Sequence, residues 1–95
     1  MSDLIKTHIA GVKFREGARD YLDRLPPGAP LALEPEEGND YDPNAVKVLH
    51  DGFHVGYVPA FLCAKVKGLL AEGRVEFASY DGDKGMVITY REAAT

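Results

Sequence analysis

The part of the sequence with the clearest chemical potential is an acidic loop, residues 36–42, followed directly by a proline. Tyr41 stands between two aspartates there, and Pro43 restrains Asp42 to an extended backbone conformation. Asn44 is expected to close the turn through its side-chain amide. A stiff loop that holds an aromatic ring beside a carboxylate is a candidate binding site. A solvated surface turn rich in turn-forming residues accounts for the same residue types.

A second group with chemical potential is the triplet Lys13-Phe14-Arg15, which places an aromatic ring between two cations. Such a triplet can stack on a nucleic-acid base and neutralise a neighbouring phosphate. We expect it at the end of the first strand, where solvated charges are also common. The triplet alone therefore leaves both interpretations open.

Residues for metal or nucleophilic chemistry are sparse. One cysteine and three scattered histidines match no zinc-ligand spacing. Asp40, Asp42 and Asn44 alternate as in a calcium loop, but Ala45 stands where that loop requires glycine. We predict no catalytic residues, no cofactor and no bound metal, and hence a protein that is not an enzyme. One alternative stays open, a metal-dependent hydrolase that would use the acidic side chains of Glu34, Glu36, Glu37, Asp40 and Asp42.

Length and composition set the class of protein. A chain of 95 residues, 45% of them hydrophobic, suits one small domain over residues 1–95. The formal net charge of −4 argues against a broad phosphate-binding surface but allows a small site that holds one strand end. The first residues lack the pattern of a signal peptide, so we expect a cytoplasmic location. Cys63 falls on an apolar stripe and is expected in the core.

Local patterns then predict the elements that must position these residues. Asp51-Gly52 between two apolar runs indicates a hairpin with a type I′ turn. Pro59 suits the first turn of a helix and Gly73 its end, which predicts the main helix over residues 59–72. A short helix is expected over residues 16–25, because apolar residues recur there at helical spacing. The predicted strands span residues 4–14, 31–34, 45–49, 53–57, 75–80 and 86–92.

The first strand has no cleanly polar face, so we expect it at the centre of the sheet. Its Gly11 suggests a bulge or a close backbone approach. The last two strands are expected to be joined by a loop over residues 81–85. The order of elements predicts a mainly β fold with a small α part, namely a small, partly open six-stranded β-barrel with one helix that caps an end.

Several stretches together resemble the HIRAN domain family. They are IAGVKF at residues 9–14, LEP at residues 33–35, NDYDPNAVKV at residues 39–48 and GYVP at residues 56–59. The resemblance extends over residues 7–91 and implies an OB-like barrel. It also implies a stand-alone member of a family that otherwise occurs at the N-terminus of fork-remodelling, helicase-like ATPases.

The resemblance further implies a function and the residues that perform it. In the eukaryotic members of the family the domain captures the 3′ end of single-stranded DNA, which implies a role in DNA repair or replication-fork processing. By motif, Tyr41 would stack on the terminal base and Asp42 would accept a hydrogen bond from the terminal hydroxyl. Lys13 and Phe14 would contact phosphate and base, and Tyr57 would line the pocket.

This chain also departs from the family pattern. Val58-Pro59-Ala60 stands after Gly56-Tyr57, where DNA-binding members carry basic residues, and Asp40 adds negative charge beside the proposed site. The chain has no ATPase motor, so a remodelling activity would require a helicase or nuclease partner. A second alternative is therefore a protein-interaction domain that keeps the fold without binding DNA.

Overall fold

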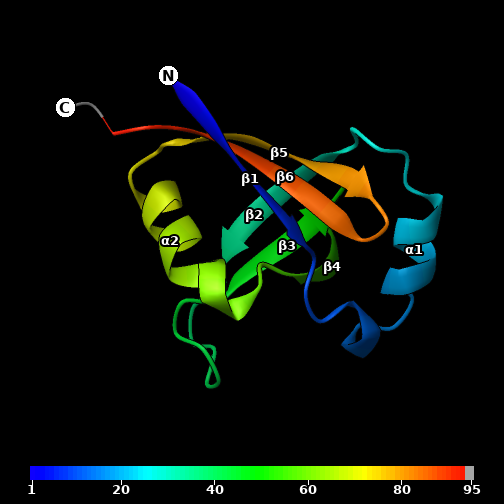
Figure 1. Ribbon diagram of the computed structural model, residues 1–95. Helices are drawn as coiled ribbons and strands as arrows, with labels where there is room; N and C mark the ends of the chain where they lie inside the picture. The colour runs from blue at the N-terminus through cyan, green and yellow to red at the C-terminus, as the bar shows by residue number, and fades with distance from the viewer. Residues whose placement is uncertain (94–95) are drawn as a thin grey trace.

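The structure is a computed structural model, and it describes residues 1–93 of the chain (Figure 1). Six strands and two α-helices follow one another, with a short 3-10 helix, η1, after the first strand. Their bounds are β1 Ser2–His8, η1 Val12–Phe14, α1 Ala18–Arg24, β2 Pro30–Pro35, β3 Val46–His50, β4 Phe53–Tyr57, α2 Ala60–Ala71, β5 Val75–Gly82 and β6 Gly85–Arg91.

All six strands form one antiparallel sheet in the order β1-β6-β5-β2-β3-β4. The sheet curls until the segment just beyond β1 reaches β4, at the other end of the strand order. There, Ala10 and Tyr57 exchange both backbone hydrogen bonds, each at 2.8 Å from nitrogen to oxygen. The predicted mainly β, partly open, six-stranded fold with two helices is confirmed.

The first strand is shorter than predicted and lies elsewhere in the sheet. It ends at His8, whereas we expected it to continue to Phe14. Gly11 has φ 71°, a left-handed conformation that no strand maintains, and η1 follows it directly. The predicted central position was also wrong, because β1 stands at one end of the strand order. The triplet that begins at Lys13 therefore lies on a tight turn and its exit rather than on a strand.

The two α-helices lie where their patterns predicted them. The first helix, α1, occupies the middle of the expected range 16–25, and α2 fills nearly all of the range 59–72. Gly73 ends α2 with φ 66° and donates its N–H to the carbonyl of Leu70, a left-handed helix end that glycine adopts without steric cost. Within residues 1–93, no helix combines the length and the apolar character needed to cross a membrane.

Both hairpins turn through two residues with positive φ. Asp51 and Gly52 have φ 48° and 81°, as expected of a type I′ turn. The β5–β6 turn is shorter than the predicted loop 81–85, because pairing continues to Gly82 and Gly85. Asp83 and Lys84 alone make this turn, at φ 48° and 58°. Residues other than glycine rarely adopt this region, so the turn carries some strain.

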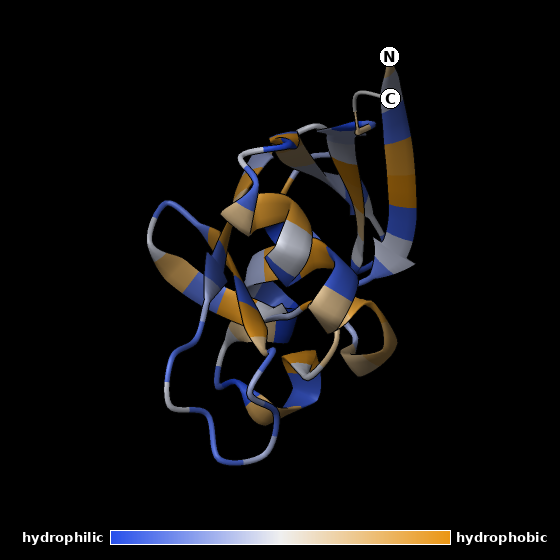
Figure 2. Cartoon of the chain, turned by 90° about the vertical axis from the view of Figure 1, so that its left-hand side faces the viewer, coloured by the Kyte–Doolittle hydropathy of each residue, from blue (hydrophilic) through white to orange (hydrophobic). Residues whose placement is uncertain are grey.

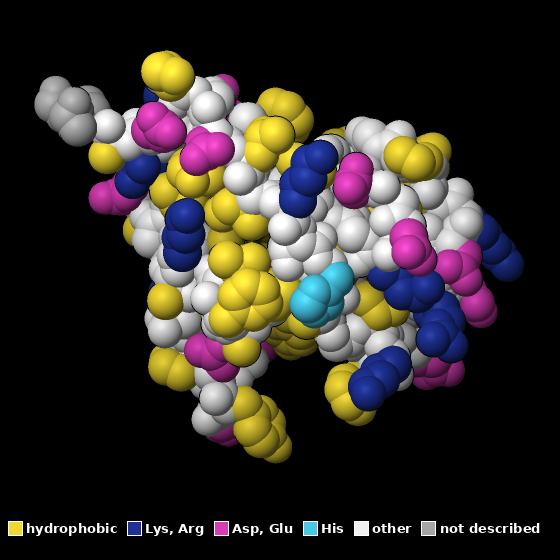
Figure 3. Space-filling view, in the orientation of Figure 1, with side chains coloured by type: hydrophobic (Ala, Val, Ile, Leu, Met, Phe, Trp, Pro, Cys, Tyr) yellow, Lys and Arg dark blue, Asp and Glu magenta, His cyan; other side chains and the backbone are white. Residues whose placement is uncertain are grey.

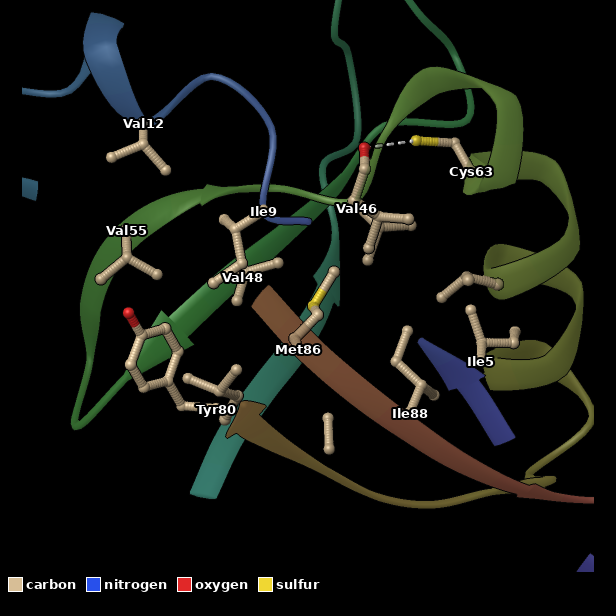
Figure 4. Packing of buried hydrophobic residues seen from close by; sticks show 14 of the residues in the cluster. Ile5, Ile9, Val12, Val46, Val48, Val55, Cys63, Tyr80, Met86 and Ile88 are labelled. Carbon is tan, nitrogen blue, oxygen red and sulfur yellow. Dashed lines mark hydrogen bonds between the residues drawn. The ribbon is translucent and has the colours of Figure 1, made fainter. Parts of the chain in front are cut away.

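The core lies between the curled sheet and α2. Figure 4 shows Val46 and Val48 of β3 meeting Met86 and Ile88 of β6, with Ile5 of β1 beside them. Strands drawn in Figure 2 alternate between hydrophobic and hydrophilic bands, as half-buried strands do. The loop between β2 and β3 is mostly hydrophilic and projects beyond this core (Figures 1 and 2).

Cys63 is confirmed as a core residue, with 2% of its surface exposed. Its thiol donates a hydrogen bond to the carbonyl of Val58 (3.1 Å; Figure 4). Burial, followed by the nearby Asp42 carboxylate, raises the pKa of the Cys63 thiol above its usual value. Cys63 is therefore a small packing residue in its thiol form at neutral pH.

The contact between the two ends of the sheet gives a prediction about Gly56. A Cβ at this position would lie 2.6 Å from the carbonyl oxygen of Ala10 and 2.6 Å from Cγ2 of Ile9. We expect Gly56→Ala to lower the free energy of unfolding by about 1–3 kcal/mol, as overpacking does. Urea denaturation measures the change.

Gly68→Ala is the matched control, because Gly68 lies in α2 and a Cβ there meets nothing within 4 Å. It should raise the free energy of unfolding by about 0.5–1 kcal/mol through helix propensity. Equal stability of the two variants would contradict a tight contact at Gly56.

Candidate functional site

An open groove of about 780 Å³ lies between the turn at η1 and the loop of residues 36–45. In Figure 1 these two segments are the lowest parts of the molecule, and Figure 3 shows the surface hollowed between them. Its lining is mainly apolar, which suits an aromatic or heterocyclic occupant. Its walls are Ala10, Gly11, Phe14, Asn39, Tyr41, Asp42, Ala45, Tyr57 and Ala60.

Four of the five residues singled out from the sequence line this groove. Phe14 lies on one wall and Tyr41 on the opposite wall, with 81% and 99% of their surfaces exposed. Asp42 and Tyr57 are half-buried and line the groove as well. Lys13 does not line it; its Nζ lies 5.1 Å from the centre of the Phe14 ring, at the outer edge of the η1 wall.

The backbone of the loop is held by its own side chains. The Oδ1 atom of Asn39 accepts hydrogen bonds from the N–H groups of Tyr41 and Asp42, each at 2.8 Å. Oδ1 of Asp42 accepts from the N–H of Asn44, also at 2.8 Å. Asn44 therefore contributes its backbone rather than the side-chain amide that we expected. These bonds fix Tyr41 and Asp42 on the groove side of the loop.

Glu36 ties the loop to the sheet, a role that sequence patterns barely indicate. Its carboxylate accepts hydrogen bonds from the Tyr57 hydroxyl at 3.0 and 3.2 Å, and from Nδ2 of Asn39 at 2.7 Å. A continuous chain of hydrogen bonds thus runs from β4 to the backbone of Tyr41. Only the spacing of three residues between Glu36 and Asn39 signalled it in the sequence.

The pKa values of Glu36 and Tyr57 follow from the same hydrogen bonds. The Asn39 hydrogen bond, helped by the Tyr57 hydroxyl and the Lys47 charge, lowers the pKa of Glu36 below its usual value of 4.5. Burial and the Glu36 carboxylate raise the pKa of Tyr57 above its usual value of 10.0. Tyr57 therefore remains a hydrogen-bond donor and Glu36 an ionised acceptor at neutral pH.

His54 packs against the Tyr57 ring, and Arg15 contacts the backbone of the same strand. The His54 ring lies edge-on to the Tyr57 ring, with 4.8 Å between centroids, and its Nε2 donates to the carbonyl of Gly56 at 2.8 Å. Burial and the Arg15 charge lower the pKa of His54, so the imidazole is neutral at pH 7. Arg15 also donates to the His54 carbonyl at 3.3 Å, which links the exit of η1 to β4.

The far end of the loop is anchored to α2. Nζ of Lys67 donates a hydrogen bond to the carbonyl of Pro43 at 2.9 Å. The loop is therefore held at one end by the Tyr57–Glu36 contact and at the other by Lys67. Its projecting tip carries Tyr41, whose ring has no such restraint and faces solvent.

The acidic residues of the loop do not converge on a shared ligand set. Glu36 faces Tyr57, Asp42 holds its own turn, and Asp40 is exposed. Within residues 1–93, no group of three or more His, Cys, Asp or Glu side chains is arranged to hold a metal ion. The oxygen-rich cluster that a hydrolase would need therefore does not form in this arrangement.

A family model described as the HIRAN domain matches residues 2–93, and the chain belongs to this family of nucleic-acid-binding modules. Among solved structures, it is similar to the HIRAN domain of human HLTF, with a TM-score of 0.72 and 18% identity over 96% of this chain and 81% of that one. It is also similar to a protein from Lactobacillus plantarum, with a TM-score of 0.66 and 17% identity over 96% of this chain and 100% of that one. No curated protein matches the chain.

The Glu36 contact gives a prediction about pH. A carboxyl group whose pKa is lowered by folding adds stability above its unfolded pKa, and this stability is lost as the pH falls through the folded pKa. We expect Tyr57→Phe to lower the free energy of unfolding by about 0.5–1.5 kcal/mol at pH 7. The difference from the wild type should shrink below pH 4.5, where Glu36 takes up a proton. Urea denaturation at pH 7 and pH 3 measures it.

Tyr90→Phe is the control, because its hydroxyl donates to Asp3 at 3.3 Å, away from the groove. Asp3 is exposed and this hydrogen bond is longer than those to Glu36, so its effect should be smaller and change less with pH. A Tyr57→Phe effect of the same size at both pH values would contradict the role assigned to Glu36.

Proposed function

We propose that this protein is a non-enzymatic module that binds the 3′ end of single-stranded DNA in the groove between η1 and the loop of residues 36–45. The observation that carries the proposal is that two exposed rings, Phe14 and Tyr41, and the carboxylate of Asp42 line one groove. Membership of the HIRAN family supports the same function. The volume falls in the range of about 300–1,000 Å³ typical of small-molecule sites, which suits a terminal nucleotide.

In this proposal the two rings hold the bases. Tyr41 stacks on the terminal base and Phe14 contacts the same or the preceding base from the opposite wall. Stacking of a base on an aromatic side chain contributes about 1–3 kcal/mol and does not depend on sequence. The apolar character of the groove lining favours such stacking over hydrogen-bond readout of the bases.

Asp42 supplies the discrimination between a strand end and a strand interior. Its Oδ1 already accepts the Asn44 N–H, but an ionised carboxylate offers about four lone-pair positions and can accept another donor. A terminal 3′-hydroxyl is such a donor, whereas a phosphodiester or a 3′-phosphate brings negative charge to the carboxylate. The site therefore binds a free hydroxyl end and repels the alternatives.

Lys13 and Tyr57 have supporting roles. Lys13 lies beside the Phe14 ring, where its ammonium group can neutralise a phosphate of the bound strand. Tyr57 lines the base of the groove, and through Glu36 it positions the loop. In DNA repair or at a replication fork, the module would deliver the captured end to a helicase or nuclease partner.

Fluorescence anisotropy with labelled oligonucleotides at low salt tests the proposal. The wild type should bind a single strand with a 3′-hydroxyl more tightly than the same strand with a 3′-phosphate. Asp42→Ala should remove this difference. Tyr41→Ala should weaken binding by about 1–3 kcal/mol, which is about fivefold to 150-fold in affinity, through the lost stacking.

Phe77→Ala is the matched control for the stacking residue. Phe77 is an exposed aromatic on β5, with 59% of its surface accessible, and it does not line the groove. Its replacement should leave the affinity unchanged. Equal binding of the two strand ends by the wild type would refute the end-recognition role, and no binding at all would favour a protein-interaction domain of the same fold.

A further inference from the structure

Positive charge is unevenly distributed over this acidic protein. The chain has 11 Lys and Arg against 15 Asp and Glu. Four of these cations, Lys13, Arg15, Arg19 and Lys84, line two adjoining hollows near η1 and α1, together with only two acidic residues, Glu16 and Asp20. Figure 3 shows dark blue side chains gathered over η1 and α1, with acidic groups among them and at their border. This face is locally basic although the chain as a whole is not.

The two hollows lie side by side and share their cations. One, of about 290 Å³, is lined by Lys13, Arg15 and Arg19; the other, of about 270 Å³, is lined by Lys13, Arg19 and Lys84. Each is a shallow, open depression. Their shape suits a chain of phosphates that lies along the surface more than a compact ligand that needs an enclosed pocket.

The basic face continues from the groove without interruption. Gly11 lines both the groove and the second hollow, and Lys13 lines both hollows while its Nζ stays 5.1 Å from the centre of the Phe14 ring. A strand that leaves the groove past Phe14 would therefore meet Lys13, which lines both hollows together with Arg19.

Lys84 is held at this face by its backbone. Its N–H donates to the Tyr80 hydroxyl oxygen at 2.9 Å, and its carbonyl accepts the N–H of Ile9 at 2.7 Å. The β5–β6 turn is thereby fixed against the segment that leads into η1. The Lys84 ammonium pairs with Asp23 at 3.6 Å, a partly exposed ion pair of the kind that contributes little in water and can be exchanged for a phosphate.

We propose that this basic face is a second binding site, for the phosphate backbone of the same single strand. It takes the nucleotides 5′ to the captured end, which cross η1 and the start of α1 in contact with Lys13, Arg19 and Lys84. The inference rests on the proposed function, because the strand end in the groove sets where the remaining chain leaves. It accounts for nucleic-acid binding by an acidic protein that lacks the basic residues of its relatives after Tyr57.

A comparison of strand lengths tests the inference. The Arg19→Ala/Lys84→Ala double variant and the wild type are titrated with a dinucleotide and a decanucleotide, both with a 3′-hydroxyl, over a series of salt concentrations. The dinucleotide fills only the groove, so its affinity should not change. The decanucleotide should bind about fivefold to tenfold less tightly at 50 mM salt for each cation removed. The salt slope, which is the slope of the logarithm of the affinity against the logarithm of the salt concentration, should fall in magnitude by about 0.7 per lost contact.

Arg24→Ala/Lys65→Ala is the control with the same loss of charge, because neither residue lines a hollow. It should bind both oligonucleotides nearly as the wild type does. Equal wild-type affinities and salt slopes for the two oligonucleotide lengths would overturn this inference and leave the end-binding groove intact. A double variant that binds both oligonucleotides as the control does would have the same consequence. Absence of binding to either oligonucleotide would remove the proposed function and this inference together.

Discussion

The backbone bridge between Ala10 and Tyr57 is the contact on which the site depends. Its two hydrogen bonds join the chain just beyond β1 to β4, the strand at the other end of the sheet. The close approach needs Gly56, where a side chain would collide with Ala10. Because the bridge fixes Tyr57 beside Gly11, it sets η1 opposite the loop that Tyr57 holds through Glu36. The width of the groove is therefore determined by the way the sheet curls.

Features encoded by neighbouring residues were predictable from the sequence. Asp51-Gly52 specified its hairpin, and Pro59 and Gly73 specified the limits of α2. Each of these signals depends only on the local backbone conformation of the residues concerned. The end of β1 was not predictable in this way. Its apolar pattern continues past His8, and only the left-handed Gly11 and the bridge to Tyr57, a contact 47 residues away, stop the strand.

In the groove, too, features set by neighbouring residues were predictable and features set by distant contacts were not. Tyr41 and Asp42 could be singled out, since Pro43 and the surrounding turn formers restrict the loop locally. That they share a groove with Phe14 could not be derived from the pattern alone, because the curl of the sheet and the Ala10–Tyr57 bridge bring η1 and the loop together. The role of Glu36 was hidden for a related reason: its partner Tyr57 lies 21 residues away, and the carboxylate looked like one of several solvated charges.

The net charge of the chain does not describe the local charge of its surface near η1. A value of −4 describes the whole chain, whereas the cations near η1 lie within reach of one another and of the groove. Electrostatic attraction falls off over about 8–10 Å at physiological ionic strength, so an approaching polyanion responds to this local group more than to distant carboxylates. The groove therefore lies between a loop wall that carries Asp42 and a turn that holds Lys13 just outside the groove.

The anchoring of the loop at both ends has a consequence for the speed and cost of recognition. With Glu36 held by Tyr57 and the Pro43 carbonyl held by Lys67, the main chain at Asp42 is already in place before any occupant arrives. Little conformational entropy remains to be lost there on association, so most of the contact energy is retained as affinity. Only the exposed phenol ring of Tyr41 has to choose a rotamer, an adjustment on the picosecond-to-nanosecond scale. An occupant of the groove therefore meets a backbone that needs no slow rearrangement before contact.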